Sequence, residues 1–418
     1  MMTPIARSKR AQTFARRILC KTQACCLGDS SGLAARSPVV RILRFVASGH
    51  RSACRAPEPQ SHRESTLTAS TLPHPDLSSW QALPKALLHE HLDGGLRPQT
   101  LLDLCRARGL QVPAQDAPAL AAWMHANADS GSLERYLRGF ALTIAAMASP
   151  EACERVAFEA AEDARLDGCV LAEFRIAPLL LEAHGVPGEA VVEALLSGLR
   201  RSALPSGLIV CAMRTDTPQE TLRSAELAAR YQGAGVIGFD LAGAERGYPP
   251  AAHATAFARA REAGLGLTCH AGEADVGSRV LEAAALGATR IGHGVNIMLG
   301  ATPAETAQWV DQARDLGLHF EVCASSNVHT GAAESLAAHP IRAMVEAGLS
   351  VSASTDNRLM SGVTLSSELQ ALHEHPGLSL AQLAQLMRNA VAASFLPAAV
   401  REAAMTAMTT AEPTRSDA

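Results

Sequence analysis

Short apolar runs alternate with longer amphipathic segments from residue 83 to about residue 400. The intervening segments repeat their apolar positions about every 3.6 residues and are rich in Ala, Leu, Glu and Arg, which predicts helices. The predicted helices include Gly188–Arg200, Gln219–Tyr231, Ala251–Ala263 and Ala304–Leu316. The apolar runs predict eight strands, at Lys85–Leu92, Cys169–Ile176, Gly207–Met213, Gly235–Leu241, Gly266–Cys269, Thr289–Gly292, Leu318–Cys323 and Leu349–Ser354. Strands and helices that alternate in this way predict an α/β fold, a closed TIM-type (β/α)8 barrel rather than an open sheet.

One gap between the predicted strands, from Arg97 to about Asp167, is too long for a single crossover. It holds four segments of helical pattern, Gln99–Arg108, Ala117–Ala126, Ser132–Met147 and Glu151–Leu166. We therefore expect part of residues 97–167 to form a small helical cap over the mouth of the barrel.

Residues 1–75 differ from the rest in composition, with twelve Lys and Arg against three Asp and Glu and no sustained apolar periodicity. They predict a disordered basic extension without chemistry of its own. An organellar transit peptide has a similar Arg-rich, Ser-rich composition and is an alternative. A twin-arginine export signal at Arg16-Arg17 is disfavoured, because Cys20-Lys21 stands where an apolar segment should follow.

The charge of the remaining chain excludes several classes of function. It carries 25 basic and 38 acidic residues, a poor counterion for phosphates, so we expect no nucleic-acid binding by the folded part. Its single lysine, Lys85, leaves no phosphate-binding loop and little scope for Schiff-base chemistry. No apolar run approaches the length of a membrane span, since the best, around Ala141–Ala148, is less than half the ~20 residues required.

The ten cysteines include no CxxC pair, and Cys169, Cys211 and Cys269 fall inside apolar runs. These three are predicted to be small buried thiols rather than metal ligands or disulfides. A chain of this length needs no disulfide staples, so a reducing compartment, the cytoplasm, is expected.

The first cluster of candidate chemistry is His89-Glu90-His91 at the end of the first predicted strand. Residues i and i+2 of a strand face the same side, so both imidazoles can share one zinc ion. The same triplet recurs at His373-Glu374-His375, at the end of a helical segment. There, positions i and i+2 diverge around the helix, which predicts a solvated helix end and not a metal site.

Three further motifs end predicted strands. His270 closes the fifth strand and is followed by Gly272 and Glu273, whose carboxyl can reach over the strand ends, although a core histidine beside a helix-capping Glu is an alternative. His293 lies between two glycines at the end of the sixth strand, where a simple turn histidine is the alternative. Asp356 follows the eighth strand and could instead be a helix N-cap.

All of these candidate residues fall at the carboxyl ends of predicted strands, where the active sites of barrel enzymes lie, so together they support a functional site more strongly than each does alone. Three His and one Asp from three separate strands can converge there on one cation and leave a coordination position for water. We therefore expect a catalytic metal centre at that rim.

The ordered set of motifs resembles the adenosine deaminase family of amidohydrolase barrels. The resemblance runs from Leu83 to about Pro397, and the basic extension lies outside it. The motifs that carry it are His89–Gly94, Ser132–Leu137 with Phe140, Glu173–Arg175, Gly238–Gly243, His270–Glu273, Gly292–Gly294, Ser325–Asn327 and Ser354–Asp356.

The resemblance implies one Zn²⁺ per chain, held by His89, His91, His270 and Asp356. It implies Glu273 as the proton donor to N1 of a purine and His293 as the group that orients or deprotonates the metal-bound water. It further implies contacts of Asp93 with the ribose 5′-hydroxyl and of the Gly243 backbone N–H with N3, and an apolar lid from Leu137 and Phe140. The expected activity is hydrolytic deamination of adenosine, and of 2′-deoxyadenosine, to inosine or deoxyinosine plus ammonia.

One position departs from the family pattern. Many members carry an Asp where this chain has Asn357, at the contact with N7 of the base. Because N7 only accepts hydrogen bonds and an Asn amide donates one directly, activity is expected to survive. An adenine or aminodeoxyfutalosine deaminase and a non-catalytic purine-binding protein are the alternatives. The expected partner is a small purine nucleoside, with no nucleic acid or membrane, and the sequence leaves a monomer or a homo-oligomer equally open.

Overall fold

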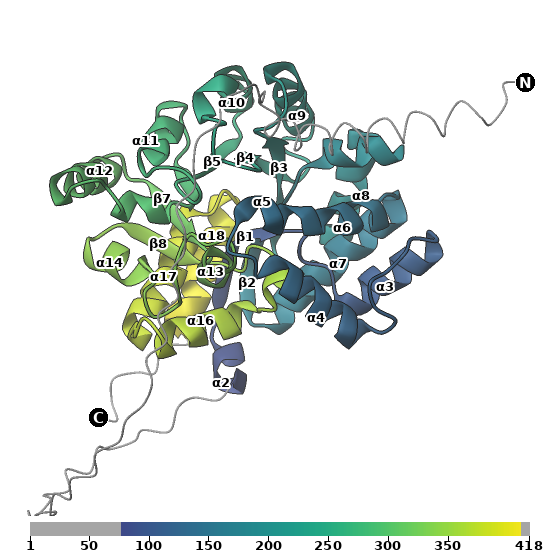
Figure 1. The fold of residues 1–418 in the computed structure, drawn as a ribbon, viewed down its shortest axis with the longest axis horizontal. Helices are drawn as coiled ribbons and strands as arrows, with labels where there is room; N and C mark the ends of the chain where they lie inside the picture. The colour runs from purple at the N-terminus through teal and green to yellow at the C-terminus, as the bar shows by residue number, and fades with distance from the viewer. Residues whose placement is uncertain (1–76, 411–418) are drawn as a thin grey trace, which may run out of the picture. The chain divides into compact units, whose positions relative to one another are not determined.

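The computed structural model describes residues 77–410, so the predictions for residues 1–75 lie outside the described residues. Eight parallel strands follow one another around the sheet in chain order (Figure 1). They are β1 Lys85–His91, β2 Cys169–Ile176, β3 Ser206–Met213, β4 Val236–Ala242, β5 Gly266–Ala271, β6 Arg290–His293, β7 His319–Val322 and β8 Ser350–Ala353. Each lies within one or two residues of its predicted position, and the TIM-type (β/α)8 fold is confirmed.

The barrel closes where the chain beyond β8 meets β1. Asp356 forms a parallel bridge with Glu90. The Asp356 N–H donates to the His89 carbonyl at 2.9 Å, and the His91 N–H donates to the Asp356 carbonyl at 2.7 Å. The backbone hydrogen bonds that close the barrel therefore also fix the positions of three candidate ligands relative to one another.

Helices form the outer layer around the strands (Figure 1). They are α7 Pro150–Leu166, α8 Gly188–Arg201, α9 Pro218–Arg230, α10 Ala254–Glu262, α11 Ser278–Ala285, α12 Pro303–Asp315, α14 Ile341–Glu346, α16 Leu365–Glu374, α17 Leu380–Ala393 and α18 Ala398–Thr410. Short turns of helix follow the carboxyl ends of five strands: η2 Pro178–His184, η3 Pro250–His253, η4 Val295–Met298, α13 Ala324–His329 and α15 Arg358–Ser361. Several of the outer helices begin as their sequences predict: at Thr217 and Ser379 a hydroxyl caps the helix reciprocally with the residue three positions on.

The long segment between β1 and β2 divides into two parts. Its first part holds α3 Pro98–Ala107, α4 Ala117–Ala128, α5 Leu133–Tyr136, η1 Leu137–Gly139 and α6 Phe140–Ala146. The single helix predicted over Ser132–Met147 is thus interrupted by a 3-10 turn that ends at Gly139, a residue of low helix propensity. The last part, α7, packs against α8 and β2 and belongs to the outer layer of the barrel. We propose that the cap consists of α3 to α6.

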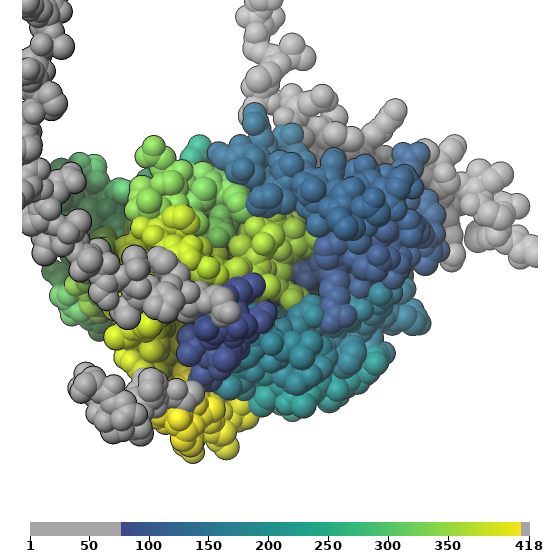
Figure 2. Space-filling view, turned by 90° about the horizontal axis from the view of Figure 1, so that it is seen from below, coloured from purple at the N-terminus to yellow at the C-terminus, as the bar shows by residue number. Residues whose placement is uncertain are grey.

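The core is continuous from the barrel to the helices, and the three thiols predicted to be buried, Cys169, Cys211 and Cys269, are buried and free. At the start of the described chain, α2 Leu77–Ala82 packs on α16, and Figure 2 shows this purple segment beside yellow-green C-terminal residues. Trp80 of α2 is buried, and the centroid of its ring lies 5.7 Å from that of His373. Within residues 77–410, no helix is long and apolar enough to cross a bilayer.

Candidate active site

Five polar side chains meet at the carboxyl ends of the strands. His89 and His91 come from β1, His270 from β5, His293 from β6, and Asp356 from the chain just beyond β8. The first four lie on strands of the barrel, and of the five only His91 is not fully buried. The centroid of the His89 ring lies 4.6 Å from that of His270 and 5.0 Å from that of His293. The fold therefore brings together residues that were predicted from motifs far apart in the sequence.

The spacing of their polar atoms suits a metal ion. His91 Nε2 lies 3.2 Å from His270 Nε2 and 3.5 Å from Asp356 Oδ1, and His89 Nε2 lies 3.3 Å from the same oxygen. A tetrahedral zinc ion with bonds of about 2.0–2.1 Å separates its ligand atoms by about 3.3–3.4 Å. His89 Nε2 is also a buried nitrogen without a hydrogen-bond partner in the described part of the chain. The donor set of imidazoles and a carboxylate therefore fits such an ion.

The outer nitrogens of two of these imidazoles are held by carboxylates. His89 Nδ1 lies 2.9 Å from Glu321 Oε2, and His270 Nδ1 lies 3.0 Å from Asp240 Oδ2. A carboxylate accepts the Nδ1 proton, which leaves the lone pair of Nε2 directed into the cluster. Arg175 joins the two carboxylates, with contacts of 2.9 Å to Asp240 and 2.6 Å to Glu321.

Protonation favours metal binding as well. Burial lowers the pKa of His91 and His270, so both rings are neutral near pH 7, as ligands must be. Burial would raise the pKa of Asp356, but its contacts with His89 and His293 hold that pKa well below the usual value, so the carboxyl is ionised. The Ser326 hydroxyl donates to Asp356 Oδ2 at 2.6 Å and leaves Oδ1 facing the imidazoles.

The geometry offers two candidates for one place in the ligand set. His89, His270, His293 and Asp356 can each present an atom within 4.8 Å of the others. His91 is the ligand that the sequence motif predicts, and its Nε2 lies 3.2 Å from His270 Nε2 and 3.5 Å from Asp356 Oδ1. His293 differs from it because its Nδ1 is occupied by the Asn327 side-chain amide at 3.0 Å.

His293 and Asp356 share an unusual backbone. Their φ angles are 61° and 59°, and they are the non-glycine residues with positive φ in the described chain. Such a conformation costs about 1–3 kcal/mol and persists only where surrounding contacts enforce it. Asp356 is not the helix N-cap that was the alternative for it, since the N-cap of α15 is Asn357 and Asp356 bonds to Ser326.

Glu273 lies beside His293, with Oε2 3.7 Å from His293 Nε2. Burial, followed by the charge of Asp356, raises the pKa of Glu273 to about 8, so its carboxyl is mostly protonated at pH 7. Its loop is held by Glu245, whose carboxylate accepts the backbone N–H groups of residues 272–275 at 2.6–3.1 Å. Glu273 is not a helix cap, since α11 begins after Gly277.

The residues predicted to contact a nucleoside come from the segments after β1, β4 and β8 and from the helices between β1 and β2. Asp93 is buried, its Oδ1 lacks a hydrogen-bond partner among residues 77–410, and burial raises its pKa to about 7. Gly243 follows β4 with a φ of 97°, a conformation that suits glycine. Asn357 Oδ1 packs so closely against Gly94 that a Cβ there would lie 1.8 Å away. Leu137 and Phe140 in the cap are half-buried.

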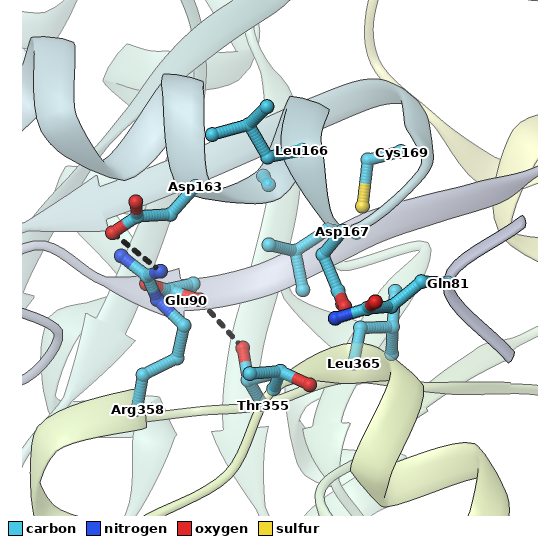
Figure 3. A pocket seen from close by; sticks show the side chains of 12 residues that line it. Gln81, Glu90, Asp163, Leu166, Asp167, Cys169, Thr355, Arg358 and Leu365 are labelled. Carbon is cyan, nitrogen blue, oxygen red and sulfur yellow. Dashed lines mark hydrogen bonds and ion pairs between the residues drawn. The ribbon is translucent and has the colours of Figure 1, made fainter. Parts of the chain in front are cut away.

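A cavity of about 260 Å³ lies behind the cluster, on the outer side of β1. Figure 3 shows its lining, where the Thr355 hydroxyl donates to Glu90 at 2.7 Å and Arg358 pairs with Asp163 at 3.1 Å. Arg358 also pairs with Glu90. None of the predicted site residues lines this cavity. It marks an ion-pair network that fastens the segment after β8 onto β1, the strand that carries His89 and His91.

The second histidine triplet behaves as a helix end. His373 and Glu374 are the last residues of α16, and His375 is exposed. The His373 ring bonds the Leu378 carbonyl through Nδ1 at 2.7 Å. Two identical tripeptides thus have different environments because one lies on a strand and the other on a helix.

Sequence reasoning gave no role to Glu321, Arg290 or Asn327. Glu321 and Arg290 pair at 2.5 Å inside the barrel, and each lies in a short strand whose residues are all buried. A charged residue within a buried strand was the available signal, because such a group persists there only when it is paired.

A closed parallel barrel with imidazoles and a carboxylate gathered at its carboxyl end defines a metal-dependent hydrolase of the amidohydrolase type. The family model described as adenosine deaminase matches residues 84–411. The chain therefore belongs to the adenosine deaminase family, and it is a hydrolytic deaminase.

Individual relatives agree with this assignment. An adenosine deaminase of Mycobacteroides abscessus is 44% identical over 77% of this chain and 93% of its own length. The crystal structure of an adenine deaminase from Arthrobacter aurescens has a TM-score of 0.70 and 26% identity, and covers 79% of this chain and 99% of that one. A zinc-bound amidohydrolase of Burkholderia ambifaria shares the fold, with a TM-score of 0.71 and 23% identity over 80% and 92% of the two chains.

Proposed function

We propose that this deaminase converts adenosine to inosine and ammonia, and acts on 2′-deoxyadenosine as well. The observation that carries the choice of a nucleoside over a free base is Asp93, a buried carboxyl whose Oδ1 has no partner among residues 77–410. A buried oxygen without a partner costs about 1–3 kcal/mol, and a sugar hydroxyl would relieve that cost. The names of the curated relatives support the same substrate.

We propose that zinc is the metal and that His89, His91, His270 and Asp356 hold it. Neutral imidazoles and a carboxylate are preferred zinc ligands, and three separations among these atoms, of 3.2–3.5 Å, are close to those of a tetrahedral site. Zinc, when bound, supplies a Lewis acid that brings water close to hydroxide near neutral pH.

Glu273 is assigned the general acid. Attack of water at C6 moves electron density onto N1 of the purine, and a carboxyl that is still protonated at pH 7 can give N1 its proton. The water oxygen bonds to C6, and one proton of the water restores the acid form of Glu273. The hydroxyl proton of the adduct passes to the amino group as the C6–N bond breaks, so that ammonia leaves and the carbonyl of inosine remains. We assign to His293, whose Nε2 lies 3.7 Å from Glu273 Oε2, the orientation of the attacking water.

The remaining contacts recognise the nucleoside. Asp93 binds the 5′-hydroxyl, the Gly243 N–H binds N3, the Asn357 amide donates to N7, and Leu137 and Phe140 cover the sugar. A cytoplasmic location, expected from the free cysteines, is part of the same proposal.

The test compares turnover of adenosine, 2′-deoxyadenosine, adenine and aminodeoxyfutalosine by purified full-length protein, followed by the ultraviolet change and by ammonia release. We expect both adenosines to have the highest kcat/KM and a chelator to abolish turnover. Preference for adenine would contradict the assignment of Asp93 to a sugar. Purine binding without turnover in zinc-loaded protein would instead indicate a binding protein.

A further inference from the structure

His339 is a buried histidine outside the proposed ligand set and substrate contacts, and it lies just before α14. Its Nδ1 accepts the backbone N–H of Ile341 at 3.0 Å, and its Nε2 lies 3.3 Å from Asn327 Oδ1. A backbone N–H can only donate, so Nδ1 carries no proton. Burial lowers the pKa of His339 to about 4, and the single proton of the neutral ring is therefore on Nε2.

This proton fixes the orientation of the Asn327 side chain. The Nε2–H of His339 donates to Oδ1, so the other end of the amide must be the nitrogen. Asn327 Nδ2 lies 3.0 Å from His293 Nδ1 and 3.4 Å from Glu273 Oε1. The choice between the two amide orientations is thus made by a backbone group that has no freedom of its own.

The orientation of the Asn327 amide determines which ring nitrogen of His293 carries the proton. An amide nitrogen only donates, so His293 Nδ1 must be an acceptor, and a proton on Nδ1 would place two donors face to face. The single proton of the neutral His293 ring is therefore on Nε2, the nitrogen that lies 3.7 Å from Glu273 Oε2. A nitrogen that bears a proton cannot offer a lone pair to a metal, which leaves that place in the ligand set to His91.

We propose that His339 is a positioning residue that acts through Asn327 to keep the only ring proton of His293 on Nε2. His293 then acts on the reacting water as a hydrogen-bond donor and does not take its proton. This consequence rests on the proposed deaminase function, whereas the tautomer itself does not.

A second buried histidine provides the contrast. His319, at the start of β7, bonds the hydroxyls of Ser350 and Ser352, both at 2.9 Å. A hydroxyl can donate or accept, so neither partner dictates which nitrogen is protonated. His319 is as buried as His339 but lies at the amino end of its strand, away from the site, and serves as the matched control.

The direct test is the tautomer of His293 in full-length protein labelled with ¹⁵N-histidine and held metal-free by a chelator. Long-range ¹H–¹⁵N correlation separates the two tautomers, and the spectrum of His293→Gln assigns the signal. We expect the Nε2–H form for His293, and a shift to the Nδ1–H form in Asn327→Asp, whose carboxylate accepts where the amide donates. An Nδ1–H form in the unaltered chain, or no change in Asn327→Asp, would overturn the proposal.

Kinetics of two variants at one position add a second readout. His339→Leu removes the donor to Asn327, and we expect kcat to fall about tenfold, the effect of losing one hydrogen bond, with KM and zinc content nearly unchanged. His339→Gln keeps an N–H near the place of Nε2 and should recover most of the loss, while His319→Leu should leave kcat unchanged. Equal losses in His339→Leu and His339→Gln would contradict the proposal. Because the spectra need no turnover, they decide the tautomer even if the proposed substrate is wrong.

Discussion

The two ends of the candidate site differ in how their buried polar groups are satisfied. At the metal end, His89 and His270 each donate the Nδ1 proton to a buried carboxylate, that of Glu321 and that of Asp240 respectively, and Asp356 accepts a hydrogen bond from the Ser326 hydroxyl. At the purine end, Asp93 Oδ1 is buried without a partner among residues 77–410, and a sugar hydroxyl could donate to it.

The difference indicates that the hydrogen bonds of the metal end are formed before the substrate binds, whereas those of the purine end are completed by the substrate. Residues of the metal end are fixed by the fold, so changes there should remove chemistry or metal while leaving substrate binding nearly intact. Residues of the purine end are completed by a ligand, so changes there should alter KM and selectivity more than kcat.

The largest effect that separates the two ends is expected for Glu273→Gln. A neutral amide cannot give a proton to N1, so kcat should fall by about 10²–10⁴-fold. Zinc content and KM should stay close to those of the unaltered enzyme, because Glu273 is not assigned to the ligand set. Glu374→Gln, at the exposed end of α16, is the matched control and should be fully active. Retention of most activity by Glu273→Gln would remove it from the mechanism.

The pH profile tests the same carboxyl without a substitution. The pKa of Glu273 is raised to about 8, so the acid is protonated below that pH and loses its proton above it. We therefore expect kcat/KM to fall with rising pH above about 8, and this limb to be missing from the residual activity of Glu273→Gln. A decline that begins far below that pH would show that another group sets the limb.

Glu321→Gln should weaken the metal end less severely. Loss of the carboxylate that holds His89 Nδ1 is expected to lower zinc affinity by about 10–100-fold, as measured by competition with a chelating indicator. The melting temperature should also fall, because Arg175 and Arg290 lose a buried charge partner. An unchanged zinc affinity would mean that the orientation of His89 does not depend on Glu321.

The smallest effect is expected at the purine end, for Asn357→Asp. An Asp must be protonated to donate to N7, whereas Asn donates directly, so kcat/KM should change by less than about tenfold. The ratio of adenosine to N7-deaza-adenosine turnover isolates the contact. Complete loss of activity in Asn357→Asp would contradict this account of N7 recognition.

The sequence alone predicted the strands, the barrel and the motifs at the strand ends, because each depends on local periodicity. The two His-Glu-His triplets show why: a period of two on β1 brings His89 and His91 together, whereas α16 separates His373 from His375. Contacts between strands were not predictable in this way. Glu321 lies 232 residues from His89, and only the closed barrel brings the two side chains to 2.9 Å.

The interruption of the cap helix was missed for a related reason. The segment from Ser132 to Met147 has helical periodicity, yet Gly139 packs against Met360 and Asn127, and the chain turns there as a 3-10 helix. The low helix propensity of Gly139 and its contacts with distant residues favour the same interruption, and only the contacts could not be read from the sequence.

The central claim is that four side chains, from strands β1 and β5 and from the segment after β8, hold one ion. The measurement that tests it most directly is the anomalous scattering, at the zinc absorption edge, of crystals of the zinc-loaded protein. We predict one peak per chain, about 2.0–2.2 Å from Nε2 of His89, His91 and His270 and from the carboxylate of Asp356, and no such peak in His270→Ala. A peak bonded to His293 in place of His91, or no peak in the unaltered protein, would contradict the account.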